Sequence, residues 1–228
     1  MRAVGRRAIL AAQVVSVAAL GCAYQDATIR ASAPERARVL GAAAPGGPAI
    51  VLHEPFVDER ADRSRCGVKR VGDGETAVVR CGDPPSQWLG HSLARELRAN
   101  GFRVYENEAP PDVPALRIEG YLEYLFIENQ FEARFTHRAT NTPEADLAVR
   151  LVAHGARFEA QRRFYIKGAG RDDGGLVERN YQEALDNAVR GSLEHMVFAI
   201  GELVASTPRF EAAACSVGAR STAPSETR

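Results

Sequence analysis

Few cysteines, almost no lysine and no net charge characterise this sequence. Its 228 residues include four cysteines and one tryptophan. Lysine occurs only at Lys69 and Lys167, so arginine supplies nearly all of the 29 basic residues, which 29 acidic residues balance. A chain without net charge has no field that would attract nucleic acid. The 45% hydrophobic content excludes collagen-like, mucin-like and wholly disordered chains, and the length suffices for one core.

Motifs of common enzymes and metal sites are also absent. The chain has no GxSxG, HExxH or P-loop motif and no paired cysteines of the zinc-binding type. Its histidines show no ligand spacing; they are His53, His91, His137, His154 and His195. We therefore expect no catalytic residue, no metal and no cofactor.

Two segments leave alternatives open. Asp58-Glu59-Arg60 follows a predicted strand, and we interpret it as a turn with a local ion pair rather than as a pair of catalytic carboxylates. Residues 168–175 are rich in glycine and aspartate, and we interpret them as a plain connection rather than a ligand nest or calcium site. A hydrolase would require these groups to converge in one cleft: Asp58, Glu59, His137 and Asp172.

The first 22 residues carry the pattern of an export signal. Three arginines precede an uncharged, mostly apolar stretch from Ala8 to Leu20, which is shorter than the ~20 residues of a membrane span. The stretch ends in Ala19-Leu20-Gly21-Cys22, which resembles the lipobox of bacterial lipoproteins. That resemblance implies cleavage before Cys22, diacylglycerol on its sulfur and an acyl chain such as palmitate on the new N-terminus. Secretion without a lipid is the alternative.

The residue after the cysteine bears on the destination of the protein. Ala23 stands there instead of Asp, as in lipoproteins that are sent on to the outer membrane. We expect a protein anchored there through Cys22 and facing the periplasm, with inner-membrane retention and surface exposure left open. Several acyl chains on one residue anchor a protein stably. Cleavage also removes three arginines and no acidic residue, so the mature chain is mildly acidic.

Two of the remaining cysteines are spaced for a disulfide-closed hairpin. An exported protein meets an oxidising compartment, where free cysteines become candidate partners. Asp73-Gly74 is a strong two-residue turn between β-branched runs. A hairpin with that turn places Val71 opposite Thr76 and Cys66 opposite Cys81, at a separation that a disulfide tolerates. The spacing predicts a Cys66–Cys81 bridge, with a buried pair of thiols as the alternative.

Hydrophobic periodicity outlines the folded part of the chain. It predicts strands over 50–57, 116–127, 147–152 and 158–166, a short strand from Phe102, and helices over 86–100 and 178–205. Ser86 is the expected N-cap of the first helix, and Pro55 indicates a strand end or an edge. Short turns between successive strands imply antiparallel pairing. We expect an α+β domain with a mainly antiparallel sheet, two helices packed on one face and the disulfide-closed hairpin.

Composition divides the chain into four parts. We expect a signal peptide over 1–21, a flexible tether over 22–49, the periplasmic α+β domain over 50–206 and a disordered tail over 207–228. A short strand within 28–31 is compatible with the tether. Cys215, in the tail, has no evident partner. Residues 128–143 carry no firm pattern and are either a hairpin extension or a mobile loop.

The order of several weak motifs resembles the YajG-like outer-membrane lipoproteins. The motifs are the lipobox at Cys22, Val57-Asp58-Glu59-Arg60, the helix from Trp88 to Gly101 with Phe102-Arg103-Val104 after it, Leu116-Arg117-Ile118, the strand exit from Phe164 to Gly168, and Asp186-Asn187-Ala188. The hairpin at 66–81 departs from that pattern. The resemblance implies an envelope-anchored, non-enzymatic periplasmic domain and supplies no catalytic residue.

These observations favour a lipid-anchored periplasmic binding or adaptor protein without catalytic activity. Its partner would be another envelope protein or a cell-wall component, contacted through a sheet face, a sheet edge or the 128–143 segment. The alternative is an auxiliary lipoprotein of an envelope lipid or solute transport system, for which we expect an apolar groove between sheet and helices. A periplasmic hydrolase is the third hypothesis.

The lipobox makes a direct prediction. Replacing the lipid-bearing residue, Cys22→Ala, removes the acceptor sulfur, so the protein should remain unprocessed or become soluble. Membrane fractionation with a mass measurement checks this. A Cys22→Ala protein that still sediments with membranes at its normal mature mass contradicts the lipoprotein assignment.

Overall fold

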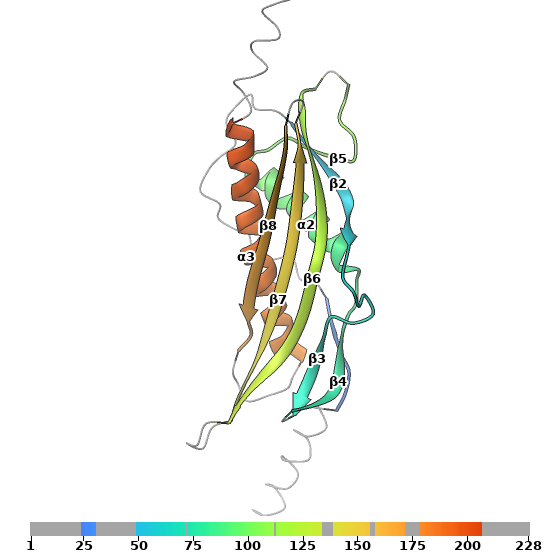
Figure 1. The fold of residues 1–228 in the computed structure, drawn as a ribbon, viewed down its shortest axis with the longest axis vertical. Coiled ribbons are helices and arrows are strands. Elements are labelled where there is room, and N and C mark those ends of the chain that lie inside the picture. The colour runs from blue at the N-terminus through green and yellow to red at the C-terminus, as the bar shows by residue number, and fades with distance from the viewer. Residues whose placement is uncertain are drawn as a thin grey trace, which may run out of the picture.

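The fold consists of one strongly curled sheet with two helices behind it (Figure 1). The computed structural model describes residues 24–30, 49–71, 73–111, 113–133, 139–155, 158–171 and 178–206. Within these ranges the sheet has eight strands. The predicted sites at Cys22, His137, Asp172 and Cys215 lie outside the described residues, as do the signal peptide and the tail.

The sheet is built on one long strand, β6, which spans Ala115–Ala133. β7, Ala139–His154, runs antiparallel along its whole length, and β8, Glu159–Ala169, runs antiparallel to β7. On the other edge of β6 two strands pair one after the other: β2, Ala49–Asp58, and then β3, Gly67–Val71. The uncertain segment 128–143 is therefore a hairpin extension on both sides of residues 134–138, which lie outside the described chain.

Three shorter strands complete the sheet. β4, Gly74–Cys81, pairs antiparallel with β3, and β1, Ala27–Ile29, pairs parallel with β4. β5, Val104–Glu106, pairs parallel with β2. β1 lies within the segment that composition marks as a tether, so these three residues belong to the sheet.

The prediction of a mainly antiparallel sheet is wrong, because the sheet is mixed. The short turns give antiparallel pairs where the sequence predicts them, at β3–β4, β6–β7 and β7–β8. The pairs β1–β4, β2–β5, β2–β6 and β3–β6 are parallel. They join segments that are distant in the chain, and a return through a helix brings a strand back parallel to its predecessor.

Pro55 is tolerated inside β2 because it lies where the pairing of β2 with its neighbouring strands is interrupted. β5 pairs with β2 only at Ile50–Leu52, and the β2–β6 register shifts between His53 and Val57. Proline lacks a backbone donor and fits at bulges and edges.

The two helices lie where the sequence predicts them. α2 spans Pro85–Ala99 and α3 spans Glu178–Ser206. The predicted cap is wrong: Pro84 is the N-cap residue, no side chain caps the first turn, and Ser86 is buried inside the helix. Pro85 suits the first position because its missing N–H would have no partner there. Gly101 ends the helix with a φ of 87°, which glycine adopts without strain.

One hydrophobic core fills the space between the sheet and both helices. Its largest fully buried side chains are Tyr181, Ile29, Ile50, Leu52, Leu89, Leu93, Leu97, Leu116, Ile118, Leu122, Ile127 and Leu147. α3 approaches β8 so closely that a Cβ at Gly168 would collide with the backbone of Ala184 and Ala188. The helices therefore pack directly on the inner face of the sheet.

Asn129 joins β3 to β6 where the backbone ladder stops. The β3–β6 pairing ends at Glu128, and the next residue's carboxamide accepts from Arg70 N at 2.7 Å and donates to Arg70 O at 2.7 Å. Its oxygen also accepts from the buried Tyr181 hydroxyl at 3.0 Å. Burial raises the pKa of Tyr181 far above its usual range, so the hydroxyl stays a donor. A side chain thus replaces one backbone pair and ties β3 to α3.

The predicted Cys66–Cys81 disulfide is present, with 5.6 Å between the two Cα atoms. The predicted register of the hairpin is wrong: Val71 pairs with Gly74 rather than with Thr76. A register shift between Lys69 and Arg70 moves the pairing by one residue, so that Gly67 pairs with Val79, and the two cysteines beyond this stretch still form the bridge.

The bridge should contribute measurable stability. It closes a loop with a sequence separation of 15, for which loop entropy gives about 3 kcal/mol. We expect the double variant Cys66→Ser, Cys81→Ser to lower the free energy of unfolding by about that amount in urea titrations. Reductant should destabilise the wild type and leave the double variant unchanged; equal sensitivity of both proteins would contradict this account.

Candidate binding surface

The face of the sheet opposite the helices, here the outer face, is open to solvent in the described part of the chain. Leu116, Ile118 and Leu122 of β6 point inward, and their neighbours Arg117, Glu119 and Tyr121 point outward. Both helices pack on the inner face (Figure 1). What the outward side chains carry therefore determines what this face can bind.

A bulge in β6 sets the composition of the outer face. The β6–β7 register shifts between Leu122 and Tyr124, so the intervening Glu123 is the extra residue. A bulge of this kind puts two successive residues opposite one on the partner strand. After it, Leu125 and Ile127 point inward, whereas Tyr124 is exposed. The alternation therefore changes phase at Glu123.

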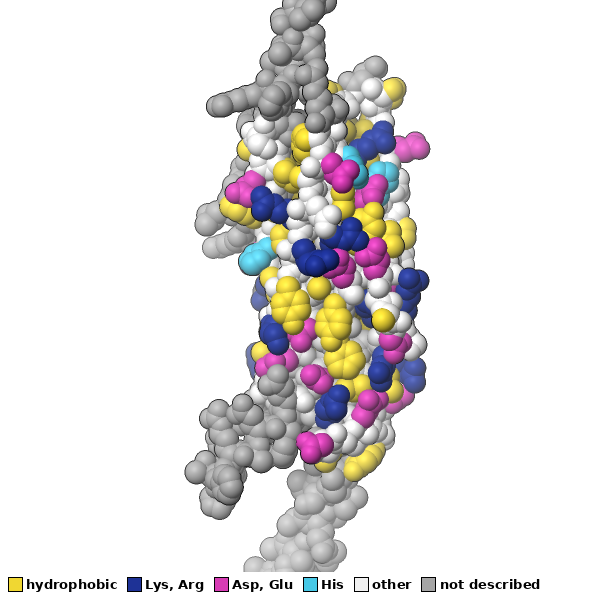
Figure 2. Space-filling model, in the orientation of Figure 1, with side chains coloured by type: hydrophobic (Ala, Val, Ile, Leu, Met, Phe, Trp, Pro, Cys, Tyr) yellow, Lys and Arg dark blue, Asp and Glu magenta, His cyan; other side chains and the backbone are white. Residues whose placement is uncertain are grey.

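Three aromatic side chains gather on the outer face beyond the bulge. Tyr124 of β6 pairs with Ala148 of β7, which pairs with Tyr165 of β8, so the two tyrosines share one row across three strands. Phe126 lies 6.3 Å from Tyr124 between ring centroids. Tyr124 is 45% exposed and Tyr165 is 58% exposed. We call Tyr124, Phe126 and Tyr165 the aromatic patch, and Figure 2 shows ring-bearing side chains gathered on this face.

The aromatic patch is framed by charges that already have partners. Asp146 accepts from the Tyr165 hydroxyl at 2.9 Å and lies 3.3 Å from Lys167 Nζ. The hydrogen bond to Asp146 raises the pKa of both Tyr165 and Lys167. Tyr165 is thereby held as a neutral donor with its ring outward. These contacts around the aromatic patch fix the position of the Tyr165 ring without a partner protein.

On the other side of the aromatic patch Arg150 organises a network of carboxylates. Its guanidinium lies 2.7 Å from Glu59 Oε2 and 2.8 Å from Glu123 Oε1, and it stacks 4.0 Å from the centroid of the Tyr121 ring. Arg163 also binds Glu123, at 2.7 Å. Burial alone would raise the pKa of Glu123, but hydrogen bonds from both arginines hold it below its usual value. The hydrogen bonds that Arg150 donates to Glu59 and Glu123 raise its own pKa.

The predicted turn after β2 is an ion pair, as we interpreted it. Arg60 donates to both oxygens of Asp58, at 3.0 and 2.9 Å, and its other nitrogen donates to Arg65 O. Burial opposes ionisation of Asp58, yet the bonds from Arg60 lower its pKa. Asp58 is thus engaged with Arg60 and Glu59 with Arg150. Neither has the unpaired, separated geometry that a hydrolase requires.

The described histidines are distributed over the molecule. His91 lies 3.0 Å from the buried carboxylate of Glu54, whose pKa burial raises. His154 lies between Glu119 and Glu159, at 3.8 and 3.5 Å. Among the described residues no group of three or more His, Cys, Asp or Glu side chains is arranged to hold a metal ion.

The described residues line a groove and a small cavity that differ in their capacity to hold a ligand. A groove of about 510 Å³ lies beside β2, β5 and β6 under residues 107–113, open to solvent, with His53 and Arg117 in its wall. A cavity of about 10 Å³ lies between β8 and α3, lined by Ile118, Leu151 and Leu203 among others. The second has room for about one water molecule, too little for a lipid chain.

Sequence reasoning found the strand that bears the aromatic patch but not the patch. The apolar residues at the end of the strand predicted over 116–127 give no sign of which face each one lies on, and in the described residues Tyr124 is exposed while Leu125 and Ile127 are buried. A tyrosine or phenylalanine in a strand has the same pattern whether it is buried or exposed. Only the bulge, which the sequence does not mark, decides its direction.

No protein-family model matches the chain, and no curated protein matches it. Among solved structures, a Xanthomonas campestris protein assigned to the DUF330 family aligns at 13% identity over 81% of this chain and 96% of its own, with a TM-score of 0.49. A neuraminyllactose-binding hemagglutinin homolog from Helicobacter pylori aligns at 14% identity over 72% and 87%, with a TM-score of 0.41. Rare lipoprotein B from Shewanella oneidensis aligns at 16% identity over 69% and 95%, with a TM-score of 0.36.

In the part of the chain that the structure describes, no helix combines the length and the apolar character needed to cross a membrane.

The network around Arg150 makes a prediction with a matched control. Arg150 is 17% exposed in its side chain and Arg163 is 64% exposed. Arg150→Met should lower the stability by about 1–3 kcal/mol, because it removes the partner of Glu59 and leaves the part-buried Glu123 with Arg163 alone. Arg163→Met should cost less than about 1 kcal/mol. Urea titrations at pH 7 measure both.

The same pair of variants has a pH signature. A carboxyl group whose folded pKa is lowered contributes stability above its unfolded pKa, and that contribution disappears as the pH falls through the folded value. The usual value for Glu123 is 4.5. The difference between Arg150→Met and the wild type should therefore shrink below that pH. A difference that persists unchanged in acid would show that Arg150 acts through packing alone.

Proposed function

We propose that this protein is a lipid-anchored adaptor of the bacterial cell envelope, without catalytic activity, that holds a protein partner on its outer face. The observation that carries the proposal is the aromatic patch: three rings on a broad, pre-ordered sheet face, with Arg150 and other charges at the rim. Aromatic residues and arginine are enriched where protein interfaces derive their binding energy.

The shape of the surface favours a protein over a small molecule. Ligand sites are concave and enclose most of the ligand, whereas the patch lies on the open face of a sheet. The rim charges are paired within the chain, so a partner does not need to neutralise them. Val57, 50% exposed, lies in the row of Tyr121 and extends the apolar area beside β2.

The anchor is the second part of the proposal. The lipobox ending at Cys22 supports a diacylglycerol anchor, and Ala23 supports the outer membrane as its location. The protein would then face the periplasm, an oxidising compartment in which the Cys66–Cys81 bridge persists.

Auxiliary function in an envelope transport system is the alternative, and it divides into two cases. A carrier role, with lipid held between sheet and helices, receives no support from the cavity of about 10 Å³ found there. An adaptor role, in which the outer face holds a transport component, uses the same surface as our proposal. The identity of the partner distinguishes this case.

Site-specific crosslinking tests the adaptor proposal. A photoreactive residue in place of Tyr165 should crosslink one defined envelope protein in living cells, because this ring is more exposed than that of Tyr124 in the same patch. The control replaces Phe198, which is 55% exposed on α3, away from the outer face. Equal products at both positions, or none at Tyr165, would contradict the proposal.

Purified components then provide the quantitative test. The double variant Tyr124→Ser, Tyr165→Ser should weaken binding of the crosslinked partner at least roughly tenfold, as expected for the centre of an interface. Phe198→Ser should bind as the wild type does. Unchanged urea midpoints confirm that neither variant disturbs the fold.

A further inference from the structure

The short chain between Cys22 and β1 limits how far the anchor can be from the folded domain. β1 begins at Ala27, and Tyr24 is the third residue before it. One residue, Ala23, separates Cys22 from Tyr24, and an extended chain spans about 3.5 Å per residue step, so these two Cα atoms lie within roughly 7 Å. The lipid-bearing residue of the proposed function therefore has almost no tether of its own.

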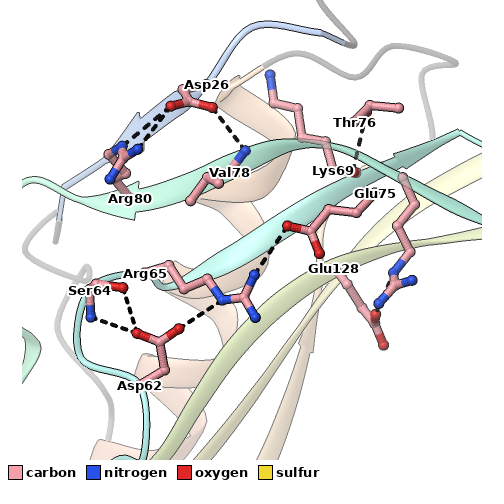
Figure 3. Close-up of polar contacts among 11 residues, drawn as sticks. Asp26, Asp62, Ser64, Arg65, Lys69, Glu75, Thr76, Val78, Arg80 and Glu128 are labelled. Carbon is pink, nitrogen blue, oxygen red and sulfur yellow. Dashed lines mark hydrogen bonds and ion pairs between the residues drawn. The ribbon is translucent and has the colours of Figure 1, made fainter.

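The chain before β1 is held against β4 by its own contacts. Asp26 accepts from Val78 N at 2.9 Å and forms an ion pair with Arg80 at 3.1 Å (Figure 3). The bonds from Val78 and Arg80 lower the pKa of Asp26. Because Asp26 is fixed at this place, Cys22 is confined to the same end of the molecule.

The strand register identifies that end. β1 is parallel to β4, with Ala27 opposite Val79, so residues before Ala27 lead towards the start of β4 at Gly74. Val79 to Gly74 is five residues, or about 17 Å of strand. Ala27 to Cys22 is also five residues, which span at most about 17 Å. Cys22 therefore lies no farther along this direction than the level of the β3–β4 turn.

The opposite end of the molecule is out of reach. β6 begins at Ala115, and its residue Ile127 pairs with Gly67 at the start of β3. The relevant part of β6 is therefore the stretch from Ala115 to Ile127. That stretch of strand is about 40 Å long. The loop of residues 107–113 lies beyond its start, at the far end of the long axis from β3 and β4 (Figure 1).

We propose that the β3–β4 turn, at Val71, Asp73 and Gly74, rests against the lipid surface that holds the Cys22 anchor, and that the domain stands on this end. Tyr24 is 61% exposed and Val71 is 40% exposed, and amphipathic tyrosine suits the boundary between headgroups and water. This inference rests on the anchor of the proposed function.

The charges at this end indicate that the anchor, not an electrostatic field, produces the contact. The arginines drawn in Figure 3 are paired: Arg65 with Asp62 and Glu75, Arg80 with Asp26, and Arg70 with Glu128. Binding to anionic lipid would need clustered unpaired basic residues. The orientation should therefore be the same on neutral and anionic membranes.

The orientation places the aromatic patch close to the membrane. Phe126 precedes Ile127, which is level with Gly67, and β3 runs from there to Val71 over about 13 Å. The partner of the outer face would accordingly be a protein at the membrane surface.

Fluorescence quenching by lipids with a nitroxide headgroup tests this orientation. The lipidated protein carries p-azidophenylalanine, coupled to a fluorophore, at Asp73 or at Glu108. These are matched sites, since both are exposed acidic residues, one in the turn and one at the far end. In vesicles of phosphatidylethanolamine and phosphatidylglycerol, we expect strong quenching at position 73 and almost none at 108. Equal quenching at both sites, or more at 108, overturns the proposal.

Two further arms identify the cause. A linker of about 20 Gly and Ser residues between Ala23 and Tyr24, with a mean span of roughly 25 Å, should abolish the difference between the two sites. Vesicles of phosphatidylcholine alone should give the same difference as the anionic vesicles. A difference that survives the linker, or that requires anionic lipid, overturns the anchor-driven orientation.

The experiment separates this inference from the proposed function. If the cellular protein proves to be unacylated by mass, the proposed anchor fails. The orientation is then tested with a chain beginning at Cys22, carrying Cys215→Ser and coupled through Cys22 to a maleimide phospholipid. Preferential quenching at position 73 supports the geometric inference, and its absence overturns it.

Discussion

β6 carries two different strands on one edge, and this sharing determines the rest of the architecture. β2 occupies the first part of that edge and β3 a later part, while β7 covers the whole opposite edge. A backbone edge left unpaired in the interior would be costly. On β6, just beyond its pairing with β3, the Asn129 carboxamide takes the place of a backbone partner and bonds Arg70 N and O. The elongated, curled sheet is the consequence of joining two short sheets to one long hairpin.

Local pattern in the sequence predicted the elements well. The apolar stripe of α3 and the helix that ends at Gly101 are set by contacts within a few residues, and such periodicity is visible in the chain. The disulfide was predictable for the same reason, because the Asp73-Gly74 turn and the distances of Cys66 and Cys81 from it along the chain bring the two cysteines together. The exact register of the hairpin was not, since a shift inside β3 leaves no mark in residue type.

Long-range pairing was not predictable from the sequence. Nothing near Ala27 indicates that it pairs with Val79, and nothing near Ile50 indicates parallel neighbours on both edges. The parallel neighbours of Ile50, β5 and β6, follow α2 in the chain, so their order in the sheet depends on the path of that helix. The same limitation applies to the surface: Tyr124 was predictable as part of a strand, but not as part of an exposed face. The ion pair of Asp58 and Arg60 was accessible because its partners are two residues apart.

The bulge at Glu123 has a consequence for how this surface can arise or be lost. Side chains alternate along a strand, so in a regular ladder the second residue after Leu122, which is Tyr124, would point inward like Leu122. Because Glu123 is an extra residue without a partner of its own, Tyr124 points outward instead, and Leu125 and Ile127 point inward. If β6 kept Glu123 but paired with β7 without the bulge, Tyr124 and Phe126 would turn toward the helices, and Leu125 and Ile127 would turn outward. Deletion of Glu123 would instead leave a regular ladder with the same residues on each face. The outer face therefore depends on the strand register at one residue as well as on residue type.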